Sequence, residues 1–163
     1  MLNSNTDMKP GIEPTVYVID DAASVRNALL ELFAVTNVRA AAFASGTEFF
    51  ETVDADSAGC VVVDLQMPHE TGLDVQRRLA SLGNNMPVIF ISGHADVPSS
   101  VTALKAGAID FIMKPFAIQD LLDAVDRAME LDGERRQAGG GQDQVRALAN
   151  PFPGDARDKK NYS

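Results

Sequence analysis

Residues 60–64 read Cys60-Val61-Val62-Val63-Asp64, and the architecture of the domain can be worked out from this stretch. Four apolar residues in a row, three of them β-branched, are typical of a strand that is buried on both faces of a parallel sheet. The run stops at a carboxylate, so this strand brings an acid to one edge of the sheet. Two other runs, residues 16–19 and 88–91, have the same character, and residues 109–113 predict a further strand.

Helical patterns alternate with these strands. Apolar side chains recur on one helical face in residues 25–33 and 73–82, and residues 38–43 predict a weaker, alanine-rich edge strand. Ser45 and Glu48 have the spacing of a capping box that opens a short helix. Two more helices are predicted at residues 96–106 and 118–131. Five strands alternating with five helices predict an α/β domain with a doubly wound parallel sheet. Its flavodoxin-like strand order, 2-1-3-4-5, follows from a fold-level prior.

The domain limits follow from where the periodic patterns begin and end. Residues 1–14 are polar and predict a flexible leader without the apolar core of a secretory signal. Residues 15–132 form the folded domain. The apolar pattern ends after Asp132, and Gly139-Gly140-Gly141 resembles a linker, so residues 133–163 are expected to form a disordered polar tail.

Composition excludes several classes of protein. The chain has 163 residues and a net charge of −9, of which residues 134–163 contribute +2. An acidic body without a basic stripe argues against direct binding of nucleic acid. A single cysteine, Cys60, excludes an internal disulfide framework, and no apolar run is long enough to cross a membrane. A cytoplasmic protein is expected.

Polar side chains follow four of the predicted strands, at the point where each strand ends. Asp20 and Asp21 follow the first strand, Asp64 the third, Ser92 the fourth and Lys114 the fifth. Because parallel strands end at the same edge, these groups should meet in the crevice where open α/β sheets bind ligands. Three neighbouring carboxylates repel each other and need a hard cation such as Mg²⁺, the Lys114 ammonium, or both.

A carboxylate beside a cation and a lysine can act as a nucleophile toward phosphorus and form an acyl phosphate. The cation, the lysine and a hydroxyl such as that of Ser92 would neutralise the phosphoryl oxygens. The chain contains no glycine-rich phosphate-binding motif of either common kind, so a nucleotide-binding fold of those kinds is unsupported.

Five motifs in order give the chain a resemblance to the receiver domain of two-component response regulators, over about residues 15–131. The fourth of them, Lys105-Ala106-Gly107-Ala108, spans the end of the predicted helix 96–106 and the residues before the last strand. The other four are Val18-Ile19-Asp20-Asp21, Val63-Asp64-Leu65-Gln66-Met67-Pro68 with Gly72, Ile91-Ser92-Gly93-His94 and Asp110-Phe111-Ile112-Met113-Lys114-Pro115-Phe116. The stretch from Ser92 to Pro98 is most similar to the FixJ-type branch. Members of that branch usually carry a helix-turn-helix output domain, for which the residues after Asp132 are too few and too polar.

This resemblance implies a role for each acid at the sheet edge. Asp64 would be the phosphoacceptor. Asp20, Asp21 and Asp64 would hold Mg²⁺ together with the backbone carbonyl of Gln66. Lys114 would bind the phosphoryl group.

The resemblance also implies a switch and its tuning. Ser92 and Phe111 would form the switch pair, acting on the face made by the fourth helix, fifth strand and fifth helix. Gln66 and His94 would tune how fast the acyl phosphate hydrolyses. The Lys114–Pro115 peptide would be cis.

The implied partner is a sensor histidine kinase or a phosphotransfer protein, and a phosphorylation-dependent homodimer is a further expectation. Such a chain is a signalling phosphoacceptor rather than an enzyme. Two alternatives remain at this point. One is a phosphohydrolase with an aspartate nucleophile, although Leu65-Gln66-Met67-Pro68 after Asp64 supplies no acid for it. The other is a module that acts only by binding.

Overall fold

The computed structural model describes residues 13–93 and 107–149, and within them the side chains of residues 13–93 and 107–137. By its internal contacts the chain divides into two units, Met1–Asp132 and Gly133–Ser163. The first unit contains the sheet and the predicted functional residues. The predicted fourth helix and His94 lie outside the described residues.

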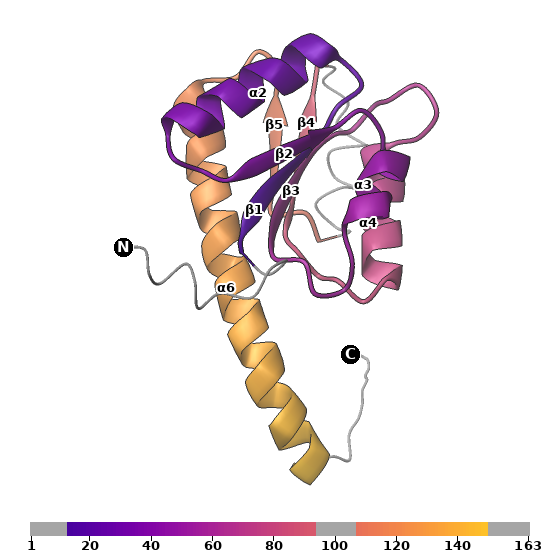
Figure 1. The fold of residues 1–163 in the computed structure, drawn as a ribbon, viewed down its shortest axis with the longest axis vertical. Coiled ribbons are helices and arrows are strands. Elements are labelled where there is room, and N and C mark those ends of the chain that lie inside the picture. The colour runs from indigo at the N-terminus through magenta and orange to yellow at the C-terminus, as the bar shows by residue number, and fades with distance from the viewer. Residues whose placement is uncertain (1–12, 94–106, 150–163) are drawn as a thin grey trace. The chain divides into compact units, whose positions relative to one another are not determined.

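A five-stranded parallel sheet with the order β2-β1-β3-β4-β5 forms the centre of the first unit (Figure 1). The structure thereby confirms the flavodoxin-like order. Strands β1, β3 and β4 are buried along their whole length, as expected for strands covered on both faces, whereas β2 at one edge is half-buried. The bounds are β1 Thr15–Ile19, β2 Ala40–Phe43, β3 Gly59–Asp64, β4 Val88–Ser92 and β5 Asp110–Met113.

The two faces of the sheet are covered by different helices, because successive side chains of a strand point to opposite faces. Val18 and Val62 pack on one face with α2 (Ala23–Val35) and α6 (Ile118–Ala149). Ile19, Val61 and Val63 pack on the other face with α3 (Gly46–Thr52) and α4 (Gly72–Ser81). Figure 1 shows these two helical layers.

The helix starts partly match the sequence analysis. The Ser45 hydroxyl accepts a hydrogen bond from the Glu48 amide at 3.2 Å, as predicted. The Glu48 carboxylate, however, accepts from the Ala44 amide rather than from Ser45, so the box is only half formed. A complete capping box stands instead at the start of α4, between Thr71 and Asp74. Its Thr-x-x-Asp spacing is visible in the sequence.

The last helix is longer than its apolar pattern predicts. Helix α6 continues past the predicted end at residue 131 to Ala149. Residues 134–138 are Glu-Arg-Arg-Gln-Ala, all strong helix formers, and they carry the helix where no apolar face remains. The apolar period marks only the part of a helix that packs on a core.

A buried carboxylate links α6 to the edge of the sheet where the parallel strands begin, which we call the amino edge. The side chain of Asp132 is fully buried and accepts a hydrogen bond from the Gly59 amide at 2.8 Å. Gly59 has a φ of 128°, and a Cβ atom there would lie 1.9 Å from the carbonyl oxygen of Thr15. The start of β3 therefore needs glycine for its conformation and Asp132 for its amide.

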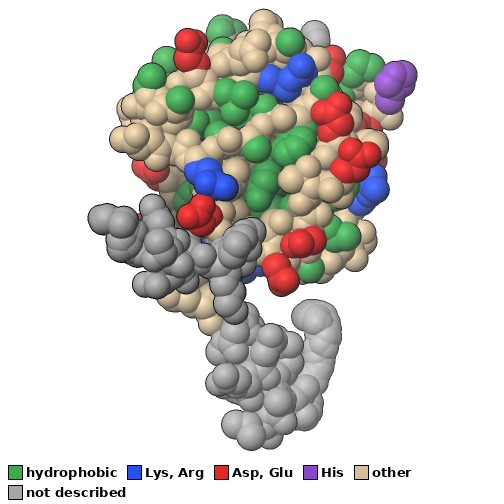
Figure 2. Space-filling model, in the orientation of Figure 1, with side chains coloured by type: hydrophobic (Ala, Val, Ile, Leu, Met, Phe, Trp, Pro, Cys, Tyr) green, Lys and Arg blue, Asp and Glu red, His purple; other side chains and the backbone are tan. Residues whose placement is uncertain are grey.

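The surface shown in Figure 2 has hydrophobic side chains along its middle, with acidic and basic side chains around them. Exposed large hydrophobic residues of the first unit include Val35 at the end of α2 and Ile118 at the start of α6. In the described part of the chain, no helix has the length and apolar character that a membrane crossing requires.

Candidate functional site

The predicted functional residues converge at the edge where the parallel strands end, which we call the carboxyl edge. Asp20 directly follows β1 and Asp64 is the last residue of β3, so the two acids stand at the ends of neighbouring strands. Ser92 ends β4, and Lys114 directly follows β5. The prediction from strand ends is therefore correct for the placement of these residues.

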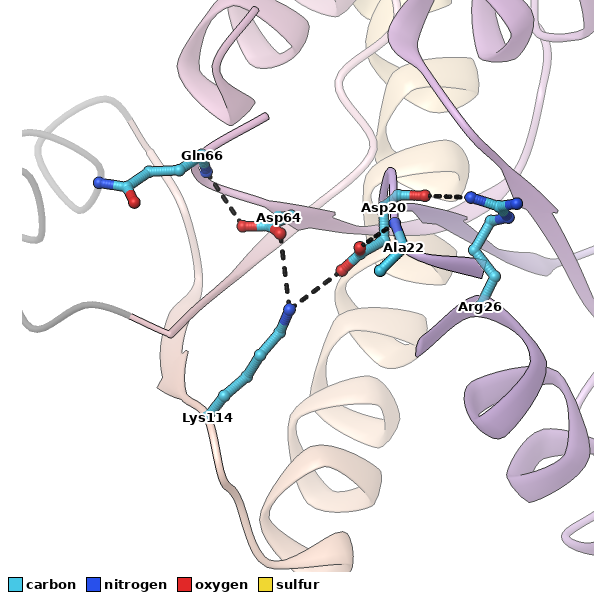
Figure 3. A network of polar contacts seen from close by, with 6 residues as sticks. All are labelled: Asp20, Ala22, Arg26, Asp64, Gln66 and Lys114. Atoms are coloured by element: carbon cyan, nitrogen blue, oxygen red, sulfur yellow. Dashed lines mark hydrogen bonds and ion pairs between the residues drawn. The ribbon is translucent and has the colours of Figure 1, made fainter. Parts of the chain in front are cut away.

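Lys114 bridges two of the acids. Its Nζ atom lies 3.2 Å from Oδ2 of Asp20 and 3.5 Å from Oδ2 of Asp64 (Figure 3). Asp20 is fully buried and Asp64 nearly so, while the Lys114 side chain is one-quarter exposed. The Lys114 ammonium thus faces two buried carboxylates at once.

Backbone amides hold the second oxygen of each acid. Oδ1 of Asp20 accepts from the Ala22 amide at 2.9 Å, and Oδ1 of Asp64 accepts from the Gln66 amide at 3.0 Å. Arg26, from α2, donates to the backbone carbonyl of Asp20 at 2.8 Å. Figure 3 shows these contacts on both sides of the acid pair. The sequence analysis did not single out Arg26, because an arginine on a helix carries no signal of a backbone partner.

The donor set fits a hard divalent cation. Asp20, Asp21 and Asp64 each offer one carboxylate oxygen, and these three oxygens lie within 4.8 Å of one another. Asp21 is exposed, so the cluster is open to solvent where Asp21 lies. Oxygen ligands from carboxylates, completed by water, are those that Mg²⁺ prefers. The three acids predicted to hold Mg²⁺ therefore bring their oxygens together.

Burial is the main influence on the ionisation of Asp64. It raises the pKa of the Asp64 carboxyl above its ordinary value of 3.8. The hydrogen bond from the Gln66 amide and the Lys114 charge oppose this rise, and the nearby Asp20 charge adds to it. A cation that neutralised the acids would make the ionised, nucleophilic form of Asp64 easier to keep.

The remaining predicted residues have different surroundings. Ser92 is fully buried and Phe111 is half-buried on β5. The Gln66 side chain is exposed and is directed away from Asp64 in Figure 3, although its amide faces the acid. The Lys114–Pro115 peptide bond is cis. The Lys114 amide donates to the Ser92 carbonyl at 2.7 Å, which joins the ends of β4 and β5.

The chain resembles known regulators over most of the first unit. The response regulator receiver domain family matches it over residues 16–126. The response regulator protein TmoT of Ectopseudomonas mendocina is 45% identical over 125 residues, which are 77% of this chain and 57% of that protein. The chain therefore spans little more than half the length of this relative.

Solved structures of similar proteins have the same fold. The response regulator StyR superposes with a TM-score of 0.77 at 40% identity, covering 83% of this chain and 69% of StyR. The structure titled FixJ-N gives a TM-score of 0.67 at 37% identity, covering 76% of this chain and 96% of that one. With the sheet order and the acids at its carboxyl edge, these matches establish that the chain belongs to the response regulator receiver domain family of two-component signalling.

Proposed function

We propose that Asp64 accepts a phosphoryl group from a histidine kinase or a phosphotransfer protein in a Mg²⁺-dependent reaction. The observation that supports this most directly is the cluster of three carboxylate oxygens beside one lysine, at the open edge of the sheet. A structural ion pair would balance its charges, whereas this site holds more acid than the lysine can neutralise.

In the proposed step, a carboxylate oxygen of Asp64 attacks phosphorus as the phosphorus–nitrogen bond of the donor phosphohistidine breaks. The imidazole leaves with the bonding electron pair, and an acyl phosphate forms on Asp64. Mg²⁺ held by Asp20, Asp21, Asp64 and the Gln66 carbonyl would supply positive charge for the phosphoryl oxygens. Lys114, already 3.5 Å from Asp64, would supply the second positive charge.

The phosphohydrolase alternative is not favoured. Residues 65–68 after Asp64 contain no acid, and the next acid along the chain, Glu70, is bonded to a backbone amide. We infer that the chain acts as a signalling phosphoacceptor whose own residues assist phosphoryl transfer and hydrolysis, and that it is not an enzyme that turns over a separate substrate.

Asp64→Asn provides the test of this assignment. The protein is mixed with Mg²⁺ and a small-molecule phosphodonor, and its intact mass is measured. One labile phosphoryl group per chain is expected on the parent protein and none on Asp64→Asn, because the amide is a poor nucleophile of nearly the same shape. Equal labelling of the parent protein and of Asp64→Asn would place the acceptor at another residue.

For the switch, we propose that a phosphoryl group on Asp64 draws the Ser92 hydroxyl inward and lets the Phe111 ring turn toward the space it vacates. Phe111 packs at the margin of the core cluster under α3 and α4 and also lines a groove between β5 and the start of α6. Because the Phe111 ring is half-buried, between the core and this groove, its position supports two packing arrangements of the ring. The proposed output is a homodimer through the face made by the predicted fourth helix, β5 and the start of α6.

Beryllofluoride, a phosphoryl mimic, tests the switch separately from the chemistry. Solvent labelling of β5 and sedimentation should both change when the mimic occupies the site in the parent protein. Phe111→Ala should bind the mimic and show no change in sedimentation. An unchanged parent protein with the mimic bound would refute the switch and leave the acceptor role of Asp64 intact.

A further inference from the structure

The residues that follow the phosphoacceptor form a closed loop, residues 65–71, which we call the acceptor loop. Its two ends are joined by an antiparallel bridge between Gln66 and Thr71, and the Met67 amide donates to the Glu70 carbonyl at 3.2 Å. The loop carries the Gln66 amide, which bonds Asp64, and the Gln66 carbonyl, which the proposed function assigns to Mg²⁺. Any movement of the loop would therefore move two groups of the site.

One side chain of the acceptor loop ties it to a different part of the fold. Oε2 of Glu70 accepts a hydrogen bond from the Gly46 amide at 2.7 Å, across 24 positions of the sequence. Gly46 is buried and is the first residue of α3. A hydrogen bond from an amide to a carboxylate is charge-assisted and stronger than one between neutral groups.

The partner of Glu70 is shaped for this contact. A Cβ atom on Gly46 would lie 2.4 Å from Oε1 of Glu70 and 3.1 Å from a methyl carbon of Val75. Glycine at position 46 leaves room for the carboxylate at its present distance from the start of α3. The hydrogen bond and the space left by glycine together place the Glu70 carboxylate against the first residue of α3.

We propose that Glu70 is a positioning residue for phosphoryl transfer to Asp64. By holding the far end of the acceptor loop against α3, it fixes the Gln66 amide on Asp64 and points the Gln66 carbonyl toward the metal ligands. This inference rests on the proposed function. It assigns to Glu70 no contact with the phosphoryl group or with the cation.

The test compares Glu70→Ala with Glu48→Ala in the full chain. Glu48 is a matched control because its carboxylate also accepts a backbone amide at the start of α3, from Ala44 at 3.1 Å, but it belongs to α3 and not to the acceptor loop. The first readout is the Mg²⁺ concentration that gives half the maximal rate of labelling by a small phosphodonor. The second is the NMR shift of the Gln66 amide in metal-free protein.

Glu70→Ala should raise the half-saturating Mg²⁺ concentration about tenfold, the lower end of the cost of removing a group that orients a metal ligand. It should also shift the Gln66 amide resonance. Glu48→Ala should change neither readout, although it removes a similar hydrogen bond. Glu70→Gln keeps an oxygen acceptor and should lie closer to the parent protein than to Glu70→Ala.

Glu70→Asp is a second, milder variant, because it keeps the charge but is one methylene too short to reach the Gly46 amide. It should change both readouts in the same direction as Glu70→Ala. The inference is wrong if Glu70→Ala and Glu70→Asp both behave like Glu48→Ala while the parent protein is labelled on Asp64. Labelling that survives Asp64→Asn would instead overturn the proposed function itself.

Discussion

At the amino edge of the sheet, the buried carboxylate of Asp132 accepts the amide of Gly59 and secures the start of β3. At the carboxyl edge, the buried carboxylates of Asp20 and Asp64 also accept backbone amides, but they share the single ammonium of Lys114. The exposed Asp21 brings a third carboxylate to the same place. Both edges thus use aspartate, but at the amino edge it secures a backbone amide, whereas at the carboxyl edge several aspartates gather around one lysine.

The two edges differ in how each acid affects the stability of the metal-free protein. Asp132 provides an acceptor that a buried amide requires, so its removal should weaken the fold. The acids of the carboxyl edge repel one another, so the folded protein bears a cost that a bound cation can relieve. Opposite effects of substitution at the two edges would therefore separate structural acids from functional ones.

The largest effect on stability is expected for Asp132→Ala. Leaving the buried Gly59 amide without this acceptor should lower the free energy of unfolding by about 2 kcal/mol. Asp132→Asn is the control, because its amide oxygen can still accept from Gly59. Urea unfolding measures both variants. Equal losses for Ala and Asn would mean that the hydrogen bond to Gly59 is not what Asp132 contributes.

A smaller effect is expected for the stabilisation by Mg²⁺. A cation present at ten times its Kd should stabilise the parent protein by about 1.4 kcal/mol through simple linkage. Asp21→Ala should remove most of this gain, since it takes one oxygen from the cluster without opening the core. Glu51→Ala removes an exposed acid of α3 and should keep the full gain. Thermal melts with and without Mg²⁺ show the outcome, and equal shifts in all three proteins would place the cation at another site.

The smallest effect concerns pH in the metal-free protein. Because the folded-state pKa of Asp64 is raised, the folded protein holds this proton more tightly than the unfolded chain does. The resulting stability is present below the ordinary pKa of 3.8 and is lost as pH rises through the folded value. Asp64→Asn should therefore be more stable than the parent at neutral pH, and this advantage should disappear in acid.

The pKa of Asp74 is shifted in the opposite direction, so Asp74 serves as a comparison for the effect of pH on stability. Its carboxylate accepts hydrogen bonds from Thr71 in the capping box, which lowers its pKa below the ordinary value of 3.8. Asp74 thus stabilises the fold above that pH and stops doing so as pH falls through the folded value. Asp74→Asn should be less stable than the parent at neutral pH. If both substitutions shift stability in the same direction there, burial does not govern Asp64.

Much of the carboxyl edge could be predicted because its residues stand at the ends of strands. Three buried apolar runs and the partly buried run at residues 109–113 identify the strands that end at the site, and the parallel arrangement then brings Asp20, Asp64 and Lys114 together without knowledge of any distance. Continuous apolar runs predict well because a buried strand tolerates few other residues. The strand order needed a fold-level prior.

The amino edge and the acceptor loop could not be predicted in this way. Asp132 and Glu70 both bond amides far away in the sequence, and a lone acid on a helix or in a loop has no period or motif that announces such a partner. The continuation of α6 to Ala149 was missed because helix propensity without an apolar face is a weak signal. The capping box at Thr71 and Asp74, by contrast, had a readable spacing.

The bond between Asp132 and Gly59 also bears on where the polypeptide can be shortened. The apolar stripe of α6 loses its last fully buried member at Ala128, so hydrophobicity alone would suggest cutting the chain there. A cut at that point would discard the one side chain that completes the backbone of β3 at its first residue. A minimal version of this domain should therefore retain Asp132, and one helical turn decides whether the trimmed protein keeps the anchoring of its central strand.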